Sequence, residues 1–404
     1  MEPTTVLATI SGRDRPGVTA SFFSALAAHD VDVRDVEQVV IRERLVLAVL
    51  FDLRGDTAAL RKSVNQTAQA LGMDSEVTVA DDPEAPQPGE RGGHGGHGGR
   101  SHVIVLGHPL RPGALSHIIQ RVADLGSNIE SMTQLSTEPA SSLELIVRSP
   151  DPALLRAELV RAAEDTGLDI AVEPAALRRR AKRLVVLDVD STLISDEAID
   201  VLARRAGVED EVVAITERAM AGDLDFAESL RARVALLAGL AEADVAEVRD
   251  SLRLTPGART FVRTLRWLGY LVGVVSGGFT FVTQRFVTEL SLDFVAANTL
   301  EIVDGVVTGR LLGEILDRPG KARALERFAE QYGVPLSQTV AVGDGANDID
   351  MLQTAGLGVA FNAKAALRSA ADTSVNLPYL DAVLFLLGIS GEDVTEAAES
   401  PGAG

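Results

Sequence analysis

Hydrophobic and polar positions in the first 80 residues change period several times, which predicts a mixture of strands and helices. Short runs of branched aliphatic residues predict strands, and apolar residues three and four positions apart predict helices. The order is strand, helix, strand, strand, helix, strand, so residues 4–80 are predicted to form one ferredoxin-like unit. The predicted elements are the strands Val6–Ile10, Val31–Val40, Leu45–Leu53 and Glu76–Val79, a helix containing Phe22 and Leu26, and a helix from about Thr57 to Leu71.

Residues 101–174 repeat this order of elements. In both copies the first strand leads into a helix through Arg-Pro-Gly, as Arg15-Pro16-Gly17 and as Arg111-Pro112-Gly113. Proline presets φ at such a turn, and glycine lets the backbone approach a neighbour or a ligand closely. The chain is therefore predicted to begin with two βαββαβ modules. The second has predicted strands at Val103–Leu106, Ile129–Ser136, Ser142–Arg148 and Asp169–Glu173, and predicted helices at Ala114–Leu125 and Pro152–Thr166.

Two polar segments separate the modules from each other and from the rest of the chain. Residues 81–100 are rich in Gly and Pro, cannot bury a core, and are predicted to be a flexible linker. His94 and His97 in this linker are candidate ligands for a transition metal, but their glycine neighbours pre-organise no site, which favours a solvated linker. The basic run Arg178–Arg183 is predicted to be a solvated connecting helix.

From residue 183 to residue 390, apolar runs alternate with helical patterns, which predicts a doubly wound, Rossmann-like parallel sheet of the α/β class. A helical stretch at about 195–255 interrupts the alternation and is predicted to be a cap inserted after the first strand. Asp304-Gly305 predicts a turn between two short strands, Glu301–Val303 and Val306–Leu311. The tail, residues 391–404, is predicted to be disordered. The other predicted strands are 184–187, 271–275, 294–297, 339–342, 358–361 and 374–377, with helices at 259–268, 279–290, 321–332, 348–354 and 364–370.

Composition and charge exclude several classes of protein. Over 404 residues the formal charge is −20 and the pI is near 4.7, which argues against a protein that coats nucleic acid, because phosphate polymers need a basic face. Zero cysteines exclude disulfides, thiol catalysis and cysteine-ligated zinc. The first residues lack the basic flank and apolar core of a secretory signal, so we expect a cytoplasmic protein. Apolar runs such as Leu268–Val275 and Leu380–Ile389 are too short to cross a bilayer, which needs about 20 residues.

Two acidic turns follow predicted strands of the sheet. Asp188 and Asp190 come directly after the apolar run 184–187, and Asp344 follows the run 339–342. Side chains two residues apart on an extended strand point to the same side, so Asp188 and Asp190 are placed to share a divalent cation. The alternative is that both carboxylates cap the following helix. Because ligands gather at the carboxyl ends of parallel strands, two acidic ends in one sheet favour a functional site.

The residues collected at these strand ends are those that phosphoryl transfer requires. Asp188 is a candidate nucleophile that forms an acyl phosphate, and Asp190 a candidate general acid and base. Magnesium, which prefers oxygen ligands, would offset repulsion between Asp188 and phosphate. The Ser276 hydroxyl, backbone N–H groups of the Ser276-Gly277-Gly278 turn, and Lys321 are candidates to hold the remaining phosphate charge.

The ordered set of an aspartate pair, Ser276, Lys321 and Gly343-Asp344-Gly345-Ala346-Asn347-Asp348 resembles the four motifs of the haloacid dehalogenase-like phosphatases. This resemblance implies that Asp188 is the nucleophile and Asp190 the acid and base. It also implies that Mg²⁺ is held by Asp188, Asp344 and the backbone carbonyl of Asp190. Asn347 is implied to contact substrate, and Asp348 to support these groups from behind.

Within that family the chain most resembles the members that act on phosphoserine. The residues that carry this closer resemblance lie in the predicted cap and are Glu197, Met220, Phe226 and Arg233. A zwitterionic phosphoserine needs a carboxylate for its ammonium group and a guanidinium for its carboxylate, and Glu197 and Arg233 supply one of each. Met220 and Phe226 are implied to cover the acyl phosphate. Without the resemblance, surface helix charges are the favoured explanation of Glu197 and Arg233, and ordinary cap core explains Met220 and Phe226 at least as well.

The two N-terminal modules resemble ACT domains, which in many metabolic enzymes bind amino acids at the strand-to-helix glycine where two modules pair. The resemblance makes Asp14, Gly17 and Gly113 candidate effector-site residues, with serine as the expected effector, and implies a homodimer formed through these modules. The alternative is that both glycines only make tight turns. Leu110 stands where the first module has Asp14, so the second site is not expected to be identical.

The expected function is hydrolysis of phosphoserine to serine and phosphate, the last step of serine biosynthesis, without nucleic-acid or membrane partners. A phosphotransferase or mutase on the same scaffold remains an alternative, as does a phosphatase for another small phosphorylated metabolite. A non-enzymatic amino-acid sensor is a further alternative, which intact Asp188, Lys321 and Asp344 argue against.

Overall fold

The computed structural model describes residues 3–41, 43–79, 99–174, 183–220 and 223–400. They form two compact units, one built mainly from residues before 180 and the other mainly from residues after it. His94 and His97 lie outside the described residues, as do most of the predicted linker and basic segments. No helix of the described ranges is long and apolar enough to cross a bilayer.

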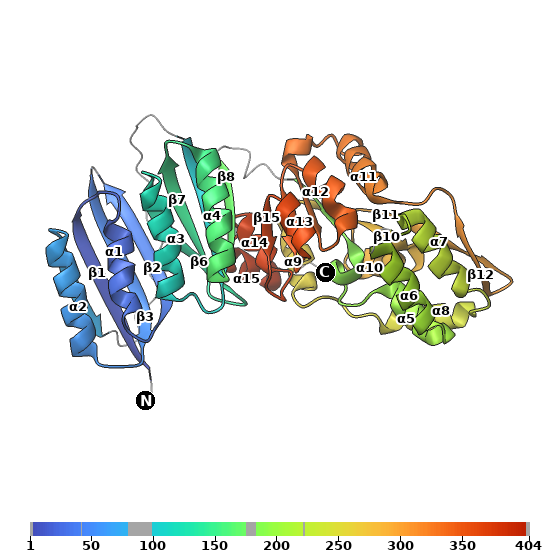
Figure 1. Ribbon diagram of the computed structural model, residues 1–404, viewed down its shortest axis with the longest axis horizontal. Helices are drawn as coiled ribbons and strands as arrows, with labels where there is room; N and C mark the ends of the chain where they lie inside the picture. Colours follow the sequence, from blue (N-terminus) through green and yellow to red (C-terminus); the bar gives the residue numbers. More distant parts are fainter. Residues whose placement is uncertain (1–2, 42, 80–98, 175–182, 221–222, 401–404) are drawn as a thin grey trace. The chain divides into compact units, whose positions relative to one another are not determined.

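The first unit contains both predicted βαββαβ modules, whose element order is confirmed. Their strands form one eight-stranded sheet in the order β4-β1-β3-β2-β6-β7-β5-β8 (Figure 1). The modules join where β2 runs antiparallel to β6, with Gln38 opposite Met132. The first module consists of β1 (Thr4–Arg13), α1 (Val18–Ala27), β2 (Val31–Ile41), β3 (Arg44–Leu53), α2 (Thr57–Ala70) and β4 (Asp74–Val79). The second consists of β5 (Gly99–Gly107), α3 (Pro112–Asp124), β6 (Asn128–Ser136), β7 (Ser141–Ser149), α4 (Pro152–Thr166) and β8 (Asp169–Pro174).

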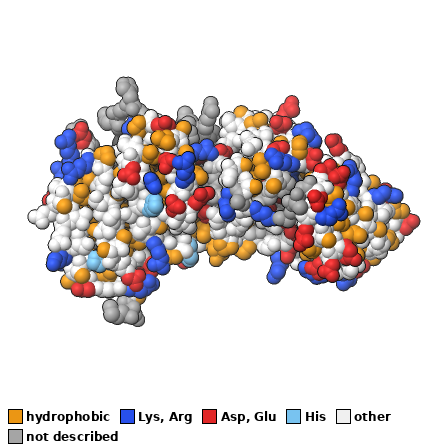
Figure 2. Space-filling view, in the orientation of Figure 1, with side chains coloured by type: hydrophobic (Ala, Val, Ile, Leu, Met, Phe, Trp, Pro, Cys, Tyr) orange, Lys and Arg blue, Asp and Glu red, His pale blue; other side chains and the backbone are white. Residues whose placement is uncertain are grey.

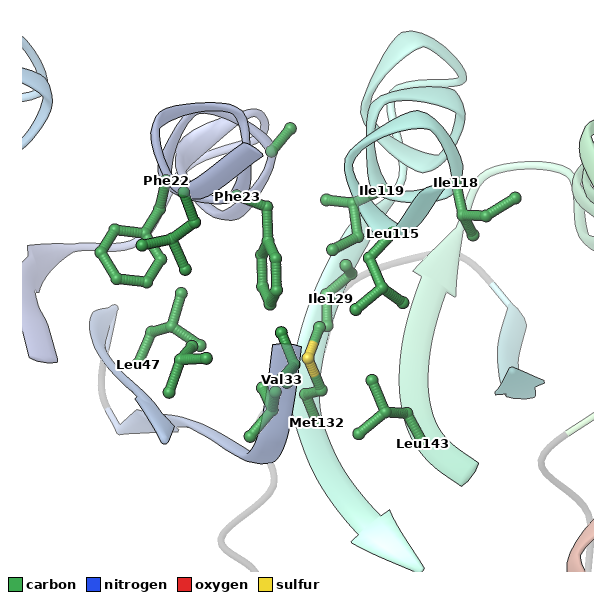
Figure 3. Close-up of a cluster of buried hydrophobic side chains, with 14 of the residues drawn as sticks. Phe22, Phe23, Val33, Leu47, Leu115, Ile118, Ile119, Ile129, Met132 and Leu143 are labelled. Atoms are coloured by element: carbon green, nitrogen blue, oxygen red, sulfur yellow. The ribbon is translucent and has the colours of Figure 1, made fainter. Parts of the chain in front are cut away.

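One hydrophobic core runs through both modules. Phe23 of α1 and Leu115 of α3 point toward the same face of the sheet, where Met132 lies between them (Figure 3). The buried polar group at this junction is satisfied, because Gln38 accepts a hydrogen bond from Thr19 at 2.8 Å and donates one to the Ile129 carbonyl at 2.7 Å. The two modules are therefore packed as one body, since separating them would expose apolar surface and unpaired polar groups.

The second unit is built on a seven-stranded sheet in the order β12-β11-β10-β9-β13-β14-β15, parallel except for β12. This confirms the predicted doubly wound parallel sheet. Its elements are β9 (Leu184–Leu187), α9 (Ala258–Trp267), β10 (Leu271–Phe279), α10 (Thr280–Glu289), β11 (Phe294–Val303), β12 (Val306–Leu312), α11 (Arg318–Gln331), β13 (Thr339–Gly343), α12 (Ile349–Thr354), β14 (Gly358–Phe361), α13 (Ala365–Ala370) and β15 (Thr373–Val375).

A cap of four helices is inserted between β9 and α9. These are α5 (Ala198–Ala206), α6 (Glu209–Met220), α7 (Phe226–Leu236) and α8 (Glu242–Ser251). The two chain segments that connect the cap to the sheet run side by side, because Ser195 N–H donates to the Arg253 carbonyl at 3.0 Å and Thr255 N–H to the Leu193 carbonyl at 2.9 Å. Acidic side chains gather over the cap helices in Figure 2, in keeping with the three acids of the first turn of α6.

The structure differs from the sequence-based expectation at two places. The predicted strands 294–297 and 301–303 are one continuous strand, β11, because residues 299–303 pair antiparallel with β12 and so extend the ladder. The predicted disorder of the tail 391–404 is wrong for residues 391–399, which form α15 (Gly391–Glu399). Ala397 in this helix is fully buried, so packing stabilises a segment whose composition alone indicates none. A short helix, α14 (Ala382–Leu386), precedes it.

Candidate active site

The site lies at the carboxyl end of the parallel sheet. All four residues of β9 are buried, so the strand is fixed on both faces before the chain reaches Asp188. The Asp188 N–H donates to the Val342 carbonyl of β13 at 2.9 Å, which extends the pairing of β9 with β13 by one residue. Asp188 and Asp344, each directly after one of these neighbouring strands, are thereby brought together.

The turn after β9 directs Asp188 and Asp190 to different partners. The Asp188 carboxylate is 3% exposed and accepts a hydrogen bond from Val189 N–H at 2.7 Å. Asp190 accepts from Ala198 N–H at 2.8 Å and from the Ser276 hydroxyl at 3.4 Å. Asp190 thus reaches the start of α5, as the capping interpretation predicts, and it also contacts Ser276 of the candidate phosphate-binding turn.

Lys321 is the one fully buried cation among the charged side chains of the described ranges. Its Nζ lies 2.7 Å from Asp188 Oδ2 and 2.7 Å from Asp348 Oδ1. Burial alone would lower the pKa of Lys321, but the facing carboxylates of Asp188 and Asp348 raise it above its ordinary value. Asp317 caps the N-terminus of α11 by accepting from Gly320 N–H at 2.8 Å, which fixes the turn that carries Lys321.

Three carboxylates converge beside this lysine. Oxygen atoms of Asp188, Asp344 and Asp348 all lie within 4.8 Å of one another. Burial and then the Asp348 charge raise the pKa of Asp188 well above its usual range, and the same two causes raise the pKa of Asp344 to about 6. Crowded oxygen donors of this kind fit a hard divalent cation such as Mg²⁺, whose charge would relieve their repulsion.

This cluster departs in part from the ligand set expected from the sequence. Asp188 and Asp344 belong to it as expected, whereas Asp348, expected to act from behind, contributes an oxygen of its own. Asp348 is also held by Lys321 and by Gly345 N–H at 3.1 Å. Thr192, which sequence reasoning left without a role, donates its hydroxyl to Asp344 at 3.1 Å. The sequence signal for this role of Thr192 is its position, two residues after Asp190.

The candidate phosphate-binding turn, Ser276-Gly277-Gly278, lies within the last residues of β10, where the pairing of β10 with β11 is irregular. Ser276 is fully buried, and its hydroxyl accepts a hydrogen bond from Gly278 N–H at 2.8 Å. A Cβ on Gly278 would collide with the Asp190 carboxylate, and a Cβ on Gly277 would lie 2.9 Å from the ring of Phe226. A side chain at either glycine would therefore displace its neighbour. Phe226 of the cap lies over the turn, as expected.

The cap and the turn after β9 contribute one carboxylate and one guanidinium near this turn. Ser191, whose φ of 55° is uncommon for a residue with a side chain, donates its hydroxyl to Glu197 at 2.9 Å. Glu197 is exposed as a residue. Burial of its carboxylate and, to a lesser extent, the charge of Asp190 nevertheless raise the pKa of Glu197 to about 7. Arg233 Nε is buried and has no hydrogen-bond partner among the described residues. Burial lowers the pKa of Arg233, an effect that the charges of Asp200 and Glu197 oppose.

Two other predicted site residues are less informative. Asn347 is half-buried, and its side-chain oxygen lies against Gly345 in the acidic turn after β13. Met220 is the last residue of α6, and its side chain lies outside the described residues. Asp200, which faces Arg233, was missed because a lone aspartate on an amphipathic helix carries no signal.

The first N-terminal module has its own buried carboxylate at the predicted effector turn. Asp14 Oδ2 accepts a hydrogen bond from Asn128 of the second module at 2.7 Å, whereas Asp14 Oδ1 is buried without a partner among the residues described. Burial raises the pKa of Asp14, and the hydrogen bond from Asn128 opposes that rise. Gly17 has a φ of 92°, and nothing lies within 4 Å of the position of a Cβ there. In the second module Leu110 is buried in the core instead.

Comparison with known proteins assigns all three predicted domains to families. Residues 185–353 match the haloacid dehalogenase-like hydrolase model, and residues 4–78 and 100–173 each match an ACT domain model. A phosphoserine phosphatase of Streptomyces coelicolor is 54% identical over 98% of this chain and 95% of its own length. Phosphoserine phosphatase SerB2 of Mycobacterium tuberculosis is 51% identical over 99% of this chain and 96% of its own. A crystal structure of a probable phosphoserine phosphatase from Vibrio cholerae matches 73% of this chain and 88% of its own, at 36% identity and a TM-score of 0.57.

Proposed function

Because the chain belongs to the phosphoserine phosphatase family of haloacid dehalogenase-like hydrolases with two ACT domains, we propose that it hydrolyses O-phospho-L-serine to L-serine and phosphate. This reaction is the last step of serine biosynthesis. The observation that supports this proposal best is the buried Asp188 carboxylate at the carboxyl end of the sheet, whose Oδ2 lies 2.7 Å from Lys321 Nζ. A carboxylate so placed is oriented for attack and has a cation beside it to offset the charge of an incoming phosphate.

The proposed reaction has two steps with Asp188 as the nucleophile. In the first, an Asp188 oxygen bonds to phosphorus while the bond from phosphorus to the serine oxygen breaks, and Asp190 gives its proton to that oxygen. In the second, Asp190 takes a proton from a water that attacks phosphorus, which releases phosphate and restores Asp188. Burial raises the pKa of Asp190, which suits a group that must carry a proton at neutral pH.

The charge of the phosphoryl group is shared among groups of the sheet domain. Lys321, which lies beside Asp188, and the Ser276-Gly277-Gly278 turn would contact its oxygens. Asp188, Asp344 and the Asp190 backbone carbonyl would hold Mg²⁺, with Asp348 beside them. When bound, Mg²⁺ supplies positive charge that polarises the phosphoryl group and offsets its repulsion by the carboxylates.

Selection of phosphoserine is assigned to Glu197 and Arg233. Arg233 offers a buried Nε that has no hydrogen-bond partner in the described part of the chain, as expected of a group that binds the substrate carboxylate. Glu197 would take the ammonium group, with Ser191 holding its carboxylate in place. Phe226 over Gly277 would exclude water from the acyl phosphate, together with Met220 at the end of α6.

The test is phosphate release by the purified full chain from phosphoserine, with and without Mg²⁺. We expect release that requires Mg²⁺ and that is faster than release from phosphothreonine or 3-phosphoglycerate. Transfer of phosphate to a second hydroxyl instead of water would point to the phosphotransferase alternative. Preference for an ester without an ammonium group would point to another small phosphorylated substrate. If the chain hydrolyses no phosphate ester, the result would favour the alternative of a non-enzymatic amino-acid sensor.

Regulation by serine at the N-terminal modules is the second part of the proposal. The unpartnered Asp14 Oδ1 would accept the ammonium group of serine, and the open space at Gly17 leaves room for the ligand. The family resemblance also suggests a homodimer through these modules in the cytoplasm. Size-exclusion chromatography coupled to light scattering, with and without serine, measures that assembly.

A further inference from the structure

A peptide unit in the phosphate-binding turn is anchored from both sides. The carbonyl of Gly277 and the N–H of Gly278 belong to one planar unit. Asn298 of β11 donates its side-chain amide to the Gly277 carbonyl at 2.8 Å. Gly278 N–H donates to the Ser276 hydroxyl at 2.8 Å. Both polar groups of this peptide are therefore fixed, although it lies between two glycines.

Such anchoring matters because glycine permits rotations that other residues resist. A flip of the 277–278 peptide would turn the Gly277 carbonyl toward the Ser276 hydroxyl and the Asp190 carboxylate. That would replace a donor by an acceptor next to the position proposed for the phosphoryl group. The hydrogen bond from Asn298 opposes this flip.

The other end of the Asn298 amide reaches a second segment of the site. Its Oδ1 accepts a hydrogen bond from Leu316 N–H at 2.8 Å. Leu316 precedes Asp317, the N-cap of α11, and Lys321 lies in the first turn of that helix, where its N–H donates to the Asp317 carbonyl at 2.9 Å. One side chain thus links the Ser276–Gly278 turn at the end of β10 to the helix that presents the buried cation.

We propose that Asn298 is a positioning residue for phosphoryl transfer, which holds the Ser276–Gly278 turn and the Lys321 turn of α11 at a fixed separation. The inference rests on the proposed phosphatase function. Asn298 is 3% exposed, so water cannot replace either hydrogen bond. The role requires an asparagine side chain, because the amide nitrogen must donate to the Gly277 carbonyl while the amide oxygen accepts from Leu316 N–H. A lone Asn in a strand carries no sequence signal for this role.

The test compares Asn298→Leu, which keeps the shape and removes both hydrogen bonds, with Asn298→Asp, which keeps the acceptor for Leu316. Thr299→Val is the matched control, since Thr299 is the next residue of β11 and its hydroxyl accepts a hydrogen bond from Thr280 at 3.3 Å, away from Gly277 and Leu316. Turnover of phosphoserine and of p-nitrophenyl phosphate is measured for each, together with inhibition by orthovanadate and the melting temperature.

We expect Asn298→Leu to lower kcat about 10- to 100-fold on both substrates and to weaken orthovanadate inhibition by a similar factor, because the turn is proposed to contact the phosphoryl group that both substrates share. Asn298→Asp should lose more activity relative to the wild type as pH rises, because an ionised carboxylate cannot donate to the Gly277 carbonyl. Thr299→Val should match the wild type.

Three outcomes separate the possible failures. Unchanged orthovanadate inhibition with a lowered kcat would mean that Asn298 only stabilises the fold, and would overturn the inference. An Asn298→Asp variant whose activity relative to wild type does not vary with pH would also contradict it, and this variant decides the matter if Asn298→Leu does not fold. Wild-type protein that releases no phosphate from either ester would instead overturn the proposed function.

Discussion

Asp188 and Asp14 both lie at strand ends, the first buried and the second half-buried, and their partners differ. Asp188, after β9, faces Lys321 at 2.7 Å and two further carboxylates. Asp14, in the turn after β1, accepts a hydrogen bond from the neutral amide of Asn128 at 2.7 Å, and its Oδ1 is buried without a hydrogen-bond partner among the described residues. The first carboxylate has its cation supplied by the protein, which suits a nucleophile. The second lacks one, which suits a receptor for a cationic ligand group.

The comparison teaches that a carboxylate after a strand has no fixed role. Both aspartates are recognisable from the sequence, yet their chemistry is decided by residues far away in the chain, Lys321 and Asn128. Desolvation raises the pKa of both. What distinguishes the two sites is that Lys321 supplies positive charge beside Asp188, whereas we propose that a ligand supplies it beside Asp14.

The largest expected effect is that of Asp188→Asn. Turnover of phosphoserine should fall about 10⁴-fold or more, because an amide cannot form the acyl phosphate. The melting temperature should change little or rise, since one of three crowded carboxylates is removed. Steady-state kinetics and differential scanning calorimetry measure both. An active variant would place the nucleophile elsewhere.

Replacing the cation is expected to have the next largest effect. Lys321→Met should lower kcat about 10²- to 10³-fold and destabilise the fold by about 3–5 kcal/mol, because Asp188 and Asp348 are left buried without a counter-charge. The pKa of Asp188 in the folded variant should then lie further above its unfolded value. A carboxyl group whose pKa is higher in the folded than in the unfolded state stabilises the fold at acid pH. This stabilisation is lost as the pH rises through the pKa of the folded state. Melting temperatures measured from acid to neutral pH without Mg²⁺ should therefore fall for the variant relative to wild type, and a constant difference would contradict this account.

Arg233→Ala tests whether a buried cation awaits the substrate. The KM for phosphoserine should rise about 10- to 100-fold, because a charged hydrogen bond to the substrate carboxylate is lost. The KM for p-nitrophenyl phosphate, which has no carboxylate, should stay near the wild-type value. Arg231→Ala, an exposed arginine on the same helix, is the matched control. Equal rises on both substrates would remove Arg233 from substrate recognition.

Glu197 predicts a pH dependence of smaller size. Its pKa of about 7 means that the ionised form, which attracts an ammonium group, dominates only above that pH. The KM for phosphoserine should therefore fall up to about tenfold between pH 6 and pH 8, while the KM for an ester without an ammonium group should not follow the same curve. Glu197→Gln should remove the difference between the two substrates.

The smallest effect on turnover is expected at the N-terminal site. Asp14→Asn should leave kcat and KM without serine unchanged, and should abolish the effect of serine, because an amide does not attract its ammonium group. Leu110→Ala in the second module should keep the serine response. Isothermal titration calorimetry with serine measures binding directly, and equal binding by wild type and Asp14→Asn would exclude this aspartate as the receptor.

The sequence predicted the elements better than their assembly. Periodicity placed nearly every strand and helix, and the Asp188 and Asp344 motifs placed the site, because both are local patterns. The pairing of β2 with β6 was not predictable, since a strand edge does not specify its partner. Asn298 was missed because its role depends on two backbone groups, of Gly277 and Leu316, that only the fold brings near. The helix at 391–399 was missed because its stability comes from burial of Ala397.

The most direct test of the central claim is a single-turnover reaction with phosphoserine, quenched in acid and examined by peptide mass spectrometry. We expect a transient phosphoryl group on the peptide that contains Asp188, absent in Asp188→Asn, which decays as phosphate appears. Phosphate release without any phosphorylated peptide, or a phosphoryl group on a different residue, would contradict the account.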